Sequence, residues 1–93
     1  MGDDTRLRNL AEELVEMHLD DCIRQANACD CDRCRLDIMA YVLNHFPPRY
    51  VVTDKGSLFS MVDAMALQSR IDILTEIMRG IALVQRYPRH EAK

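Results

Sequence analysis

Three cysteines with the spacing C-x-C-x-x-C, at positions 29, 31 and 34, lead directly into an apolar segment that stops at Pro47-Pro48. Thiolates this close together can converge on one soft metal ion, and a structural zinc site takes four nitrogen or sulfur ligands. A chain of 93 residues has a small core, which a metal or a second subunit commonly supplements. The spacing therefore predicts structural zinc, with Cys29, Cys31 and Cys34 as three ligands.

The fourth zinc ligand has to come from elsewhere, and the candidates are His90 and Cys22, with His18 behind them. His90 follows the last predicted helix, and it returns to the cluster if that helix runs antiparallel to the helix after the cysteines. Cys22 shares a face with His18 on the first predicted helix, where a small cysteine is commonly a core residue. The geometry favours His90, and Cys22 stays open as the alternative.

Apolar periodicity predicts an all-α fold of three helices in a single domain spanning residues 1–93. The helical period of 3.6 residues gives helices over about 4–27, 33–46 and 57–87. Pro47 forces the residue before it out of the helical region and ends the second helix. Residues 49–52 are then expected to leave as a short extended segment.

The third predicted helix carries two apolar stripes, one running from Phe59 to Val84. The second stripe consists of Leu67, Ile71, Leu74 and Met78. Two apolar faces on one long helix require two packing partners, so we expect a symmetric homodimer through this helix. Gly80 costs a helix about 1 kcal/mol relative to alanine, which predicts close approach of another backbone there.

A polar line runs along the otherwise apolar second helix, because Asp37, Tyr41 and Asn44 are spaced i, i+4, i+7. Such a line is either an internally satisfied network or the floor of a pocket. As a network, Asp37 pairs with Arg35 or Arg49 and braces the metal loop. As a pocket floor, it accepts hydrogen bonds from a ligand, and the sequence leaves both interpretations open.

Several classes of function are disfavoured by the residues. A closed zinc site has no open position for water, and the chain has no glycine-rich phosphate loop and no carboxylate pair placed to share a site, so we expect a non-enzyme. The acidic start and the lack of a long apolar run predict a cytoplasmic protein without a membrane partner. A net charge of −3 does not favour binding to duplex DNA.

The stretch from Cys29 to Gly56 resembles the ComFB family, named for late competence development in bacteria. The resemblance rests on the cysteine cluster, on CRLDI, on N-x-x-P-P-R-Y-V, and on YPRH at positions 87–90. It implies a small all-α, zinc-containing homodimer without known enzymatic activity, whose C-terminal end returns a ligand to the cluster. Some members of the family bind cyclic dinucleotides.

This resemblance, together with residue chemistry, predicts a signalling receptor for a cyclic dinucleotide that acts through contacts with an unknown protein partner. The candidate ligand-binding residues are Arg35, Asp37, Arg49 and Tyr50. Guanidinium groups bind phosphates, the tyrosine offers an aromatic face, and Asp37 can accept hydrogen bonds from guanine, which favours cyclic di-GMP over cyclic di-AMP. The alternative is a structural or adaptor protein related to late competence that binds no such ligand.

Overall fold

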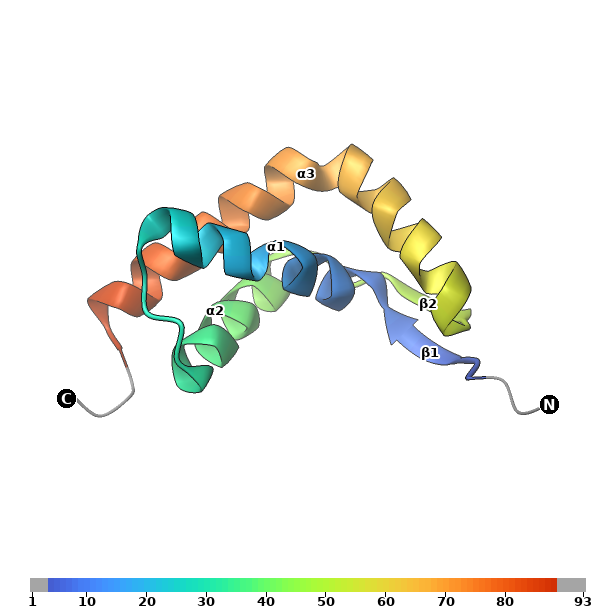
Figure 1. Cartoon of the computed structure of the whole chain (residues 1–93), viewed down its shortest axis with the longest axis horizontal. Coiled ribbons are helices and arrows are strands. Elements are labelled where there is room, and N and C mark those ends of the chain that lie inside the picture. The colour runs from blue at the N-terminus through green and yellow to red at the C-terminus, as the bar shows by residue number, and fades with distance from the viewer. Residues whose placement is uncertain (1–3, 89–93) are drawn as a thin grey trace.

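The computed structural model describes residues 4–88, which form three helices and a two-stranded sheet (Figure 1). The elements in chain order are β1 (Arg6–Asn9), α1 (Leu10–Ala26), α2 (Asp32–His45), β2 (Tyr50–Thr53) and α3 (Lys55–Arg86). The described part of the chain is mostly helical. The three predicted helices and the extended segment after Pro48 are therefore confirmed.

The first helix begins later than predicted, because residues 6–9 form a strand. β1 pairs antiparallel with β2, with Leu7 opposite Val52 and Arg8 opposite Val51. Leu7 and Leu10 also fit a helical period, which is why the sequence alone extended the helix too far. The prediction of helix over residues 4–9 was wrong because long-range pairing with β2 overrides that local pattern.

Side-chain caps fix the helix boundaries. Asn9 begins α1 by accepting a hydrogen bond from the Ala11 N–H at 3.1 Å, and Asp54 begins α3 by accepting one from the Ser57 N–H at 2.7 Å. α1 ends at Asn27, which has a left-handed φ of 53° that asparagine tolerates well. Phe46 is extended because Pro47 follows it, and α2 stops there.

The hydrophobic core lies between the inner face of α3 and the two shorter helices. Its fully buried members include Leu14 and Leu19 of α1, Ile38 of α2, and Ile73 and Ile77 of α3. Figure 1 shows α3 arching along the whole molecule, with the sheet near its start and the α1–α2 loop near its end. Because α3 packs against both shorter helices, its inner stripe organises the fold.

The close approach predicted at Gly80 is confirmed, and the neighbour is α2. A β-carbon at this position would lie 3.0 Å from Tyr41 Cδ1 and 3.5 Å from the Ile38 carbonyl oxygen. Contacts of 3.0 Å are tighter than a real side chain normally makes. The absence of a side chain at Gly80 therefore lets α2 pack directly on α3.

The second apolar stripe of α3 is largely left open by the described residues, although Leu74 packs against the core. Leu67 is 88% exposed and Ile71 is 79% exposed, and Met78 is also exposed. The inner stripe, in contrast, is buried from Leu58 to Val84, although Phe59 points to solvent. The long helix thus has one satisfied apolar face and one open apolar face.

A search of the described residues for membrane spans found no helix long and apolar enough to cross a bilayer.

Candidate functional site

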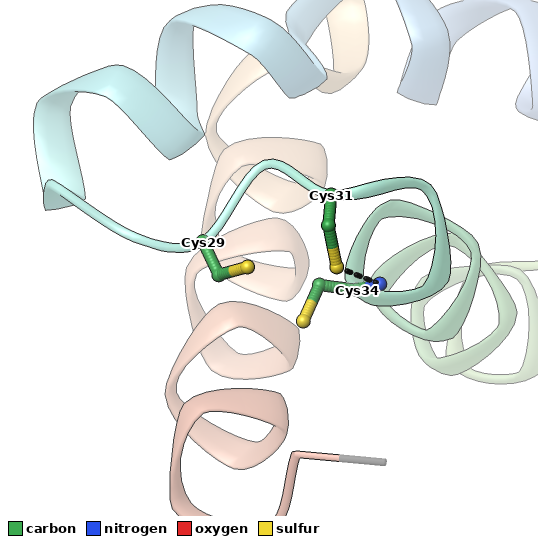
Figure 2. Close-up of side chains that lie close together, drawn as sticks. All are labelled: Cys29, Cys31 and Cys34. Atoms are coloured by element: carbon green, nitrogen blue, oxygen red, sulfur yellow. Dashed lines mark hydrogen bonds between the residues drawn. The ribbon is translucent and has the colours of Figure 1, made fainter. Parts of the chain in front are cut away.

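The three cysteines converge where the α1–α2 loop enters α2. The Sγ atoms of Cys29, Cys31 and Cys34 all lie within 4.8 Å of one another, and Figure 2 shows the three side chains directed toward a common space. A tetrahedral zinc ion with bonds of about 2.3 Å separates its sulfur ligands by about 3.8 Å. The observed spacing therefore fits one metal ion after a small closing movement, and these three thiols can hold it.

Local structure explains why the thiols differ in environment. Cys31 is the N-cap of α2, and its Sγ accepts a hydrogen bond from the Cys34 N–H at 3.4 Å. This hydrogen bond is the main cause that lowers the pKa of Cys31. Burial raises the pKa of Cys34 to about 12, so this thiol becomes a thiolate mainly when a cation compensates for its burial.

Cys22 is not a member of this cluster. It lies in the core on α1, and burial raises the pKa of its thiol. Its sulfur is not among those grouped with Cys29, Cys31 and Cys34 in the described part of the chain. These observations fit the interpretation of Cys22 as a core residue.

His90 lies outside the described residues, but the end of α3 does come to the cluster. Pro88, the last described residue, lines a small cavity of about 120 Å³ together with Cys29 and Cys34. Val84 and Ile38 line the same cavity. The chain therefore leaves the described region beside the thiols, as an antiparallel arrangement of α2 and α3 requires.

The predicted polar line forms the floor of a groove between α2 and α3. Asp37, Tyr41 and Asn44 line it from α2, and Leu83 and Tyr87 face them. The groove has a volume of about 370 Å³. Part of the polar line is also satisfied internally, because Asp37 pairs with Arg33 at 3.2 Å and Asn44 donates to the Ala40 carbonyl at 2.9 Å.

The four predicted ligand residues do not lie together within one chain. Arg35 forms an ion pair with Asp20 of α1, whereas Asp37 faces the α2–α3 groove. Arg49 lies beyond the other end of α2, which stops at His45, and Pro47-Pro48 separate it from the helix. The pairing of Asp37 with Arg35 or Arg49 does not occur either, since its partner is Arg33.

Arg49 and Tyr50 also face different sides of the sheet. Arg49 lines a groove of about 300 Å³ with Val51 and Met65, on the side of the sheet that faces α3. Tyr50 pairs with Asn9 on the opposite face, beside Leu7 and Val52, and is exposed. Alternation along an extended strand separates the two side chains.

Sequence reasoning missed three residues near the α2–α3 groove. Tyr87 closes it from the end of α3, and the guanidinium of Arg86 lies 5.6 Å from the centre of the Tyr87 ring. Arg33 adds a second cation beside Asp37. The spacing of Arg33 and Asp37, four residues apart on α2, was visible in the sequence. Tyr87 and Arg86 could be placed beside the groove only once α3 was known to run alongside α2.

The fold and the cysteine cluster define a small, mostly helical protein with a site that can hold a metal ion. The chain belongs to the ComFB family, because the family model described as "Late competence development protein ComFB" matches residues 8–88. A solved structure, the late competence protein ComFB from Bacillus subtilis, is 27% identical with a TM-score of 0.78, and the match covers 95% of this chain and 100% of that one. No curated protein matches it.

Proposed function

We propose that this late-competence family member is a zinc-containing homodimeric receptor for a cyclic dinucleotide, cyclic di-GMP ahead of cyclic di-AMP, and that it signals through protein contacts rather than catalysis. The observation that carries the proposal is the α2–α3 groove. Its floor presents the Asp37 carboxylate and Tyr41, and Tyr87 faces them from α3. A polar acceptor and aromatic faces are groups with which proteins bind a nucleobase.

Guanine fits the groove better than adenine does because of its donors. The N1 and N2 hydrogens of guanine lie on one edge and match a carboxylate acceptor, whereas adenine offers an acceptor at N1. Asp37 is partly exposed, and its present partner is an exposed arginine, so the ion pair costs little to rearrange. The Asn44 amide lies about two helical turns further along the same floor.

Arginine side chains that could bind the phosphates lie both beside the α2–α3 groove and away from it. Arg33 and Arg86 lie beside Asp37 and Tyr87, and they supply guanidinium groups near the base site. Arg49, at the other end of α2, makes no ion pair within residues 4–88. In the proposed dimer, Arg49 is therefore a separate candidate for binding a phosphate, and Tyr50, on the other face of the sheet, is a separate candidate for stacking on a base.

We further infer one structural zinc ion per chain, held by Cys29, Cys31, Cys34 and His90. The convergent thiols and the position of Pro88 beside them support this ligand set. Bound zinc would link the α1–α2 loop to the end of α3 and add folding free energy. Elemental analysis should give one equivalent of zinc, and His90→Ala should lower zinc affinity more than Cys22→Ala does.

The homodimer is proposed to form through the open stripe of α3. The exposed side chains of Leu67 and Ile71 support it, since large apolar side chains at such exposure are usually covered by a partner. A two-fold dimer also suits a two-fold ligand, because equivalent residues of each chain can bind equivalent halves.

Isothermal titration calorimetry with cyclic di-GMP and cyclic di-AMP on zinc-loaded dimer tests the receptor. Asp37→Asn should weaken cyclic di-GMP binding at least tenfold, and Tyr87→Ala should weaken binding of both nucleotides. Asp63→Asn, an exposed carboxylate elsewhere on α3, is the matched control. Absence of heat with both nucleotides would reject the receptor, and the double variant Arg35→Ala/Arg49→Ala measures what the more distant arginines contribute.

A ligand-free adaptor is the second candidate, and the outer face of the sheet favours it. Leu7 and Val52 are paired there and both are largely exposed, with Tyr50 beside them. An adaptor needs an apolar surface that remains open after dimerisation. A dimer that binds neither nucleotide but keeps this face accessible would support the adaptor.

A further inference from the structure

Two of the cluster thiols occupy the first turn of α2 with the spacing C-x-x-C. Cys31 is the N-cap, and Cys34 lies three residues later with its N–H directed at the Cys31 sulfur. Side chains at positions i and i+3 of a helix have β-carbons about 5–6 Å apart, and a disulfide requires about 3.8 Å. A bond between these two sulfurs, already within 4.8 Å, therefore needs only a small movement at the start of α2.

We propose that Cys31 and Cys34 form a peroxide-sensitive dithiol, which is oxidised to an intrachain disulfide and thereby expels the metal held by the cluster. The proposal goes beyond the receptor function and does not depend on nucleotide binding.

The oxidation balances with hydrogen peroxide as the oxidant. The Cys31 thiolate attacks one peroxide oxygen, an S–O bond forms, the O–O bond breaks and hydroxide leaves, which gives a sulfenic acid. The Cys34 thiolate then attacks that sulfur, the S–S bond forms and a second hydroxide leaves. Two thiolates, one peroxide and two protons give one disulfide and two waters, while the zinc ion keeps its charge.

Burial assigns the order of the two steps. Cys31 is partly accessible to solvent, so peroxide reaches it, whereas Cys34 is 2% exposed and lies in the core. Cys34 is therefore the thiol that resolves the sulfenic acid. Because the helix holds it three residues away, this step is intramolecular and outpaces a second oxidation.

Cys29 is the less suitable partner, although its sulfur belongs to the same cluster. It lies in the α1–α2 loop, is exposed, and is separated from Cys31 by Asp30. Cys34 is fixed by the first turn of α2, whereas Cys29 lies outside that turn. The geometry therefore points to the pair within the turn.

Disulfide formation removes two of the three thiolates that can bind the metal. The α1–α2 loop then keeps the backbone hydrogen bond from the Ala28 N–H to the Ile23 carbonyl at 3.0 Å, but it loses its metal link to α2. We expect the oxidised chain to release its metal and to melt at a lower temperature. Reduction by dithiothreitol with added zinc should restore both.

Trypsin makes the disulfide identifiable, because cleavage after Arg24, Arg33 and Arg35 separates the cysteines. Peptide 25–33 carries Cys29 and Cys31, and dipeptide 34–35 carries Cys34. Zinc-loaded wild-type protein treated with a small excess of hydrogen peroxide should release one zinc ion per chain to a chromogenic chelator. Mass spectrometry without reduction should then show peptide 25–33 joined to dipeptide 34–35.

Variants assign the sulfur within peptide 25–33. Cys29→Ser should keep the cross-link and Cys31→Ser should lose it, while Cys22→Ser, in the core of α1, should behave as wild type. An internal disulfide in peptide 25–33, a link between chains, sulfinic acid at Cys31, or retained zinc would each overturn the proposal. The wild-type measurements decide between these outcomes even if a variant fails to fold, which circular dichroism would reveal.

Discussion

Gly80 of α3 lies so close to Tyr41 of α2 that a β-carbon at position 80 would lie 3.0 Å from the Tyr41 Cδ1 atom. The ring of Tyr41 stacks on His45 with a centroid distance of 4.2 Å, and the same side chain lines the α2–α3 groove. The contact therefore sets both the packing of α2 on α3 and the shape of the candidate ligand site.

Substitution Gly80→Ala sets two effects against each other. Alanine improves helix propensity by about 1 kcal/mol, whereas overpacking a tight contact costs about 1–3 kcal/mol. We expect a net loss of about 1 kcal/mol in the free energy of unfolding, measured by urea denaturation. Gly56→Ala is the control, because its β-carbon meets only Asp54 Oδ1 at an ordinary 3.5 Å. A Gly80→Ala protein more stable than wild type would contradict the steric argument.

Asn9 joins two elements through one oxygen. Its Oδ1 accepts from the Ala11 N–H at 3.1 Å and from the Arg49 N–H at 2.8 Å. Asn9→Ala should lower the free energy of unfolding by about 1–2 kcal/mol, because it removes a helix cap and leaves a second donor without this partner. Asn9→Asp keeps the acceptor, so it should retain most of the stability in the same denaturation experiment. Equal losses of unfolding free energy in both variants would show that the side-chain acceptor does not account for the stabilisation.

Asp4 should make stability depend on pH in the acidic range. Its carboxylate accepts from the Lys55 N–H at 3.2 and 3.3 Å, which lowers the pKa of Asp4 below its ordinary value. A pKa that is lower in the folded state means that the charged carboxylate stabilises the fold. This stabilisation is complete above the unfolded pKa of about 4, and it is lost as the pH falls through the folded pKa. The melting temperature of Asp4→Asn should therefore lie below that of wild type at pH 7 and converge with it below about pH 4. A difference in melting temperature between Asp4→Asn and wild type that is equally large at pH 7 and at pH 3 would contradict this assignment.

Chelation should destabilise the protein through the cysteine cluster. Removing zinc from wild-type protein should lower its melting temperature, because a structural metal contributes folding free energy. Cys34→Ser should melt at the temperature of chelated wild type and should not respond to chelator. A chelator effect of the same size in Cys34→Ser and wild type would place the metal elsewhere.

The open stripe of α3 predicts the effect of a charge on association. Ile71→Glu places a carboxylate at the centre of the exposed stripe and should convert the dimer into a monomer, measured by light scattering at micromolar concentration. Glu16→Lys changes the charge at an exposed position of α1, away from this stripe, and should leave the dimer intact. A dimer that survives Ile71→Glu would move the interface away from this stripe.

Local sequence patterns fixed the helices and the cysteine cluster. The end of α2 follows from Pro47, and the convergence of Cys29, Cys31 and Cys34 follows from a spacing too short to separate them. The close approach at Gly80 followed from the cost of a glycine within a helix. The first two features depend on residues only a few positions apart, whereas the glycine marked a close approach without identifying its neighbour, which is Tyr41 and Ile38 of α2.

Tertiary structure decided which distant segments meet. Residues 6–9 form a strand because they pair with β2. The apolar pattern of residues 6–9 does not indicate this pairing. Asp37 pairs with Arg33 rather than with Arg49, because α2 keeps Arg49 at its far end. The groove closed by Tyr87 exists because α3 runs alongside α2. Local propensity determines elements, whereas the burial of shared apolar faces determines their arrangement, and the candidate ligand site depends on that arrangement.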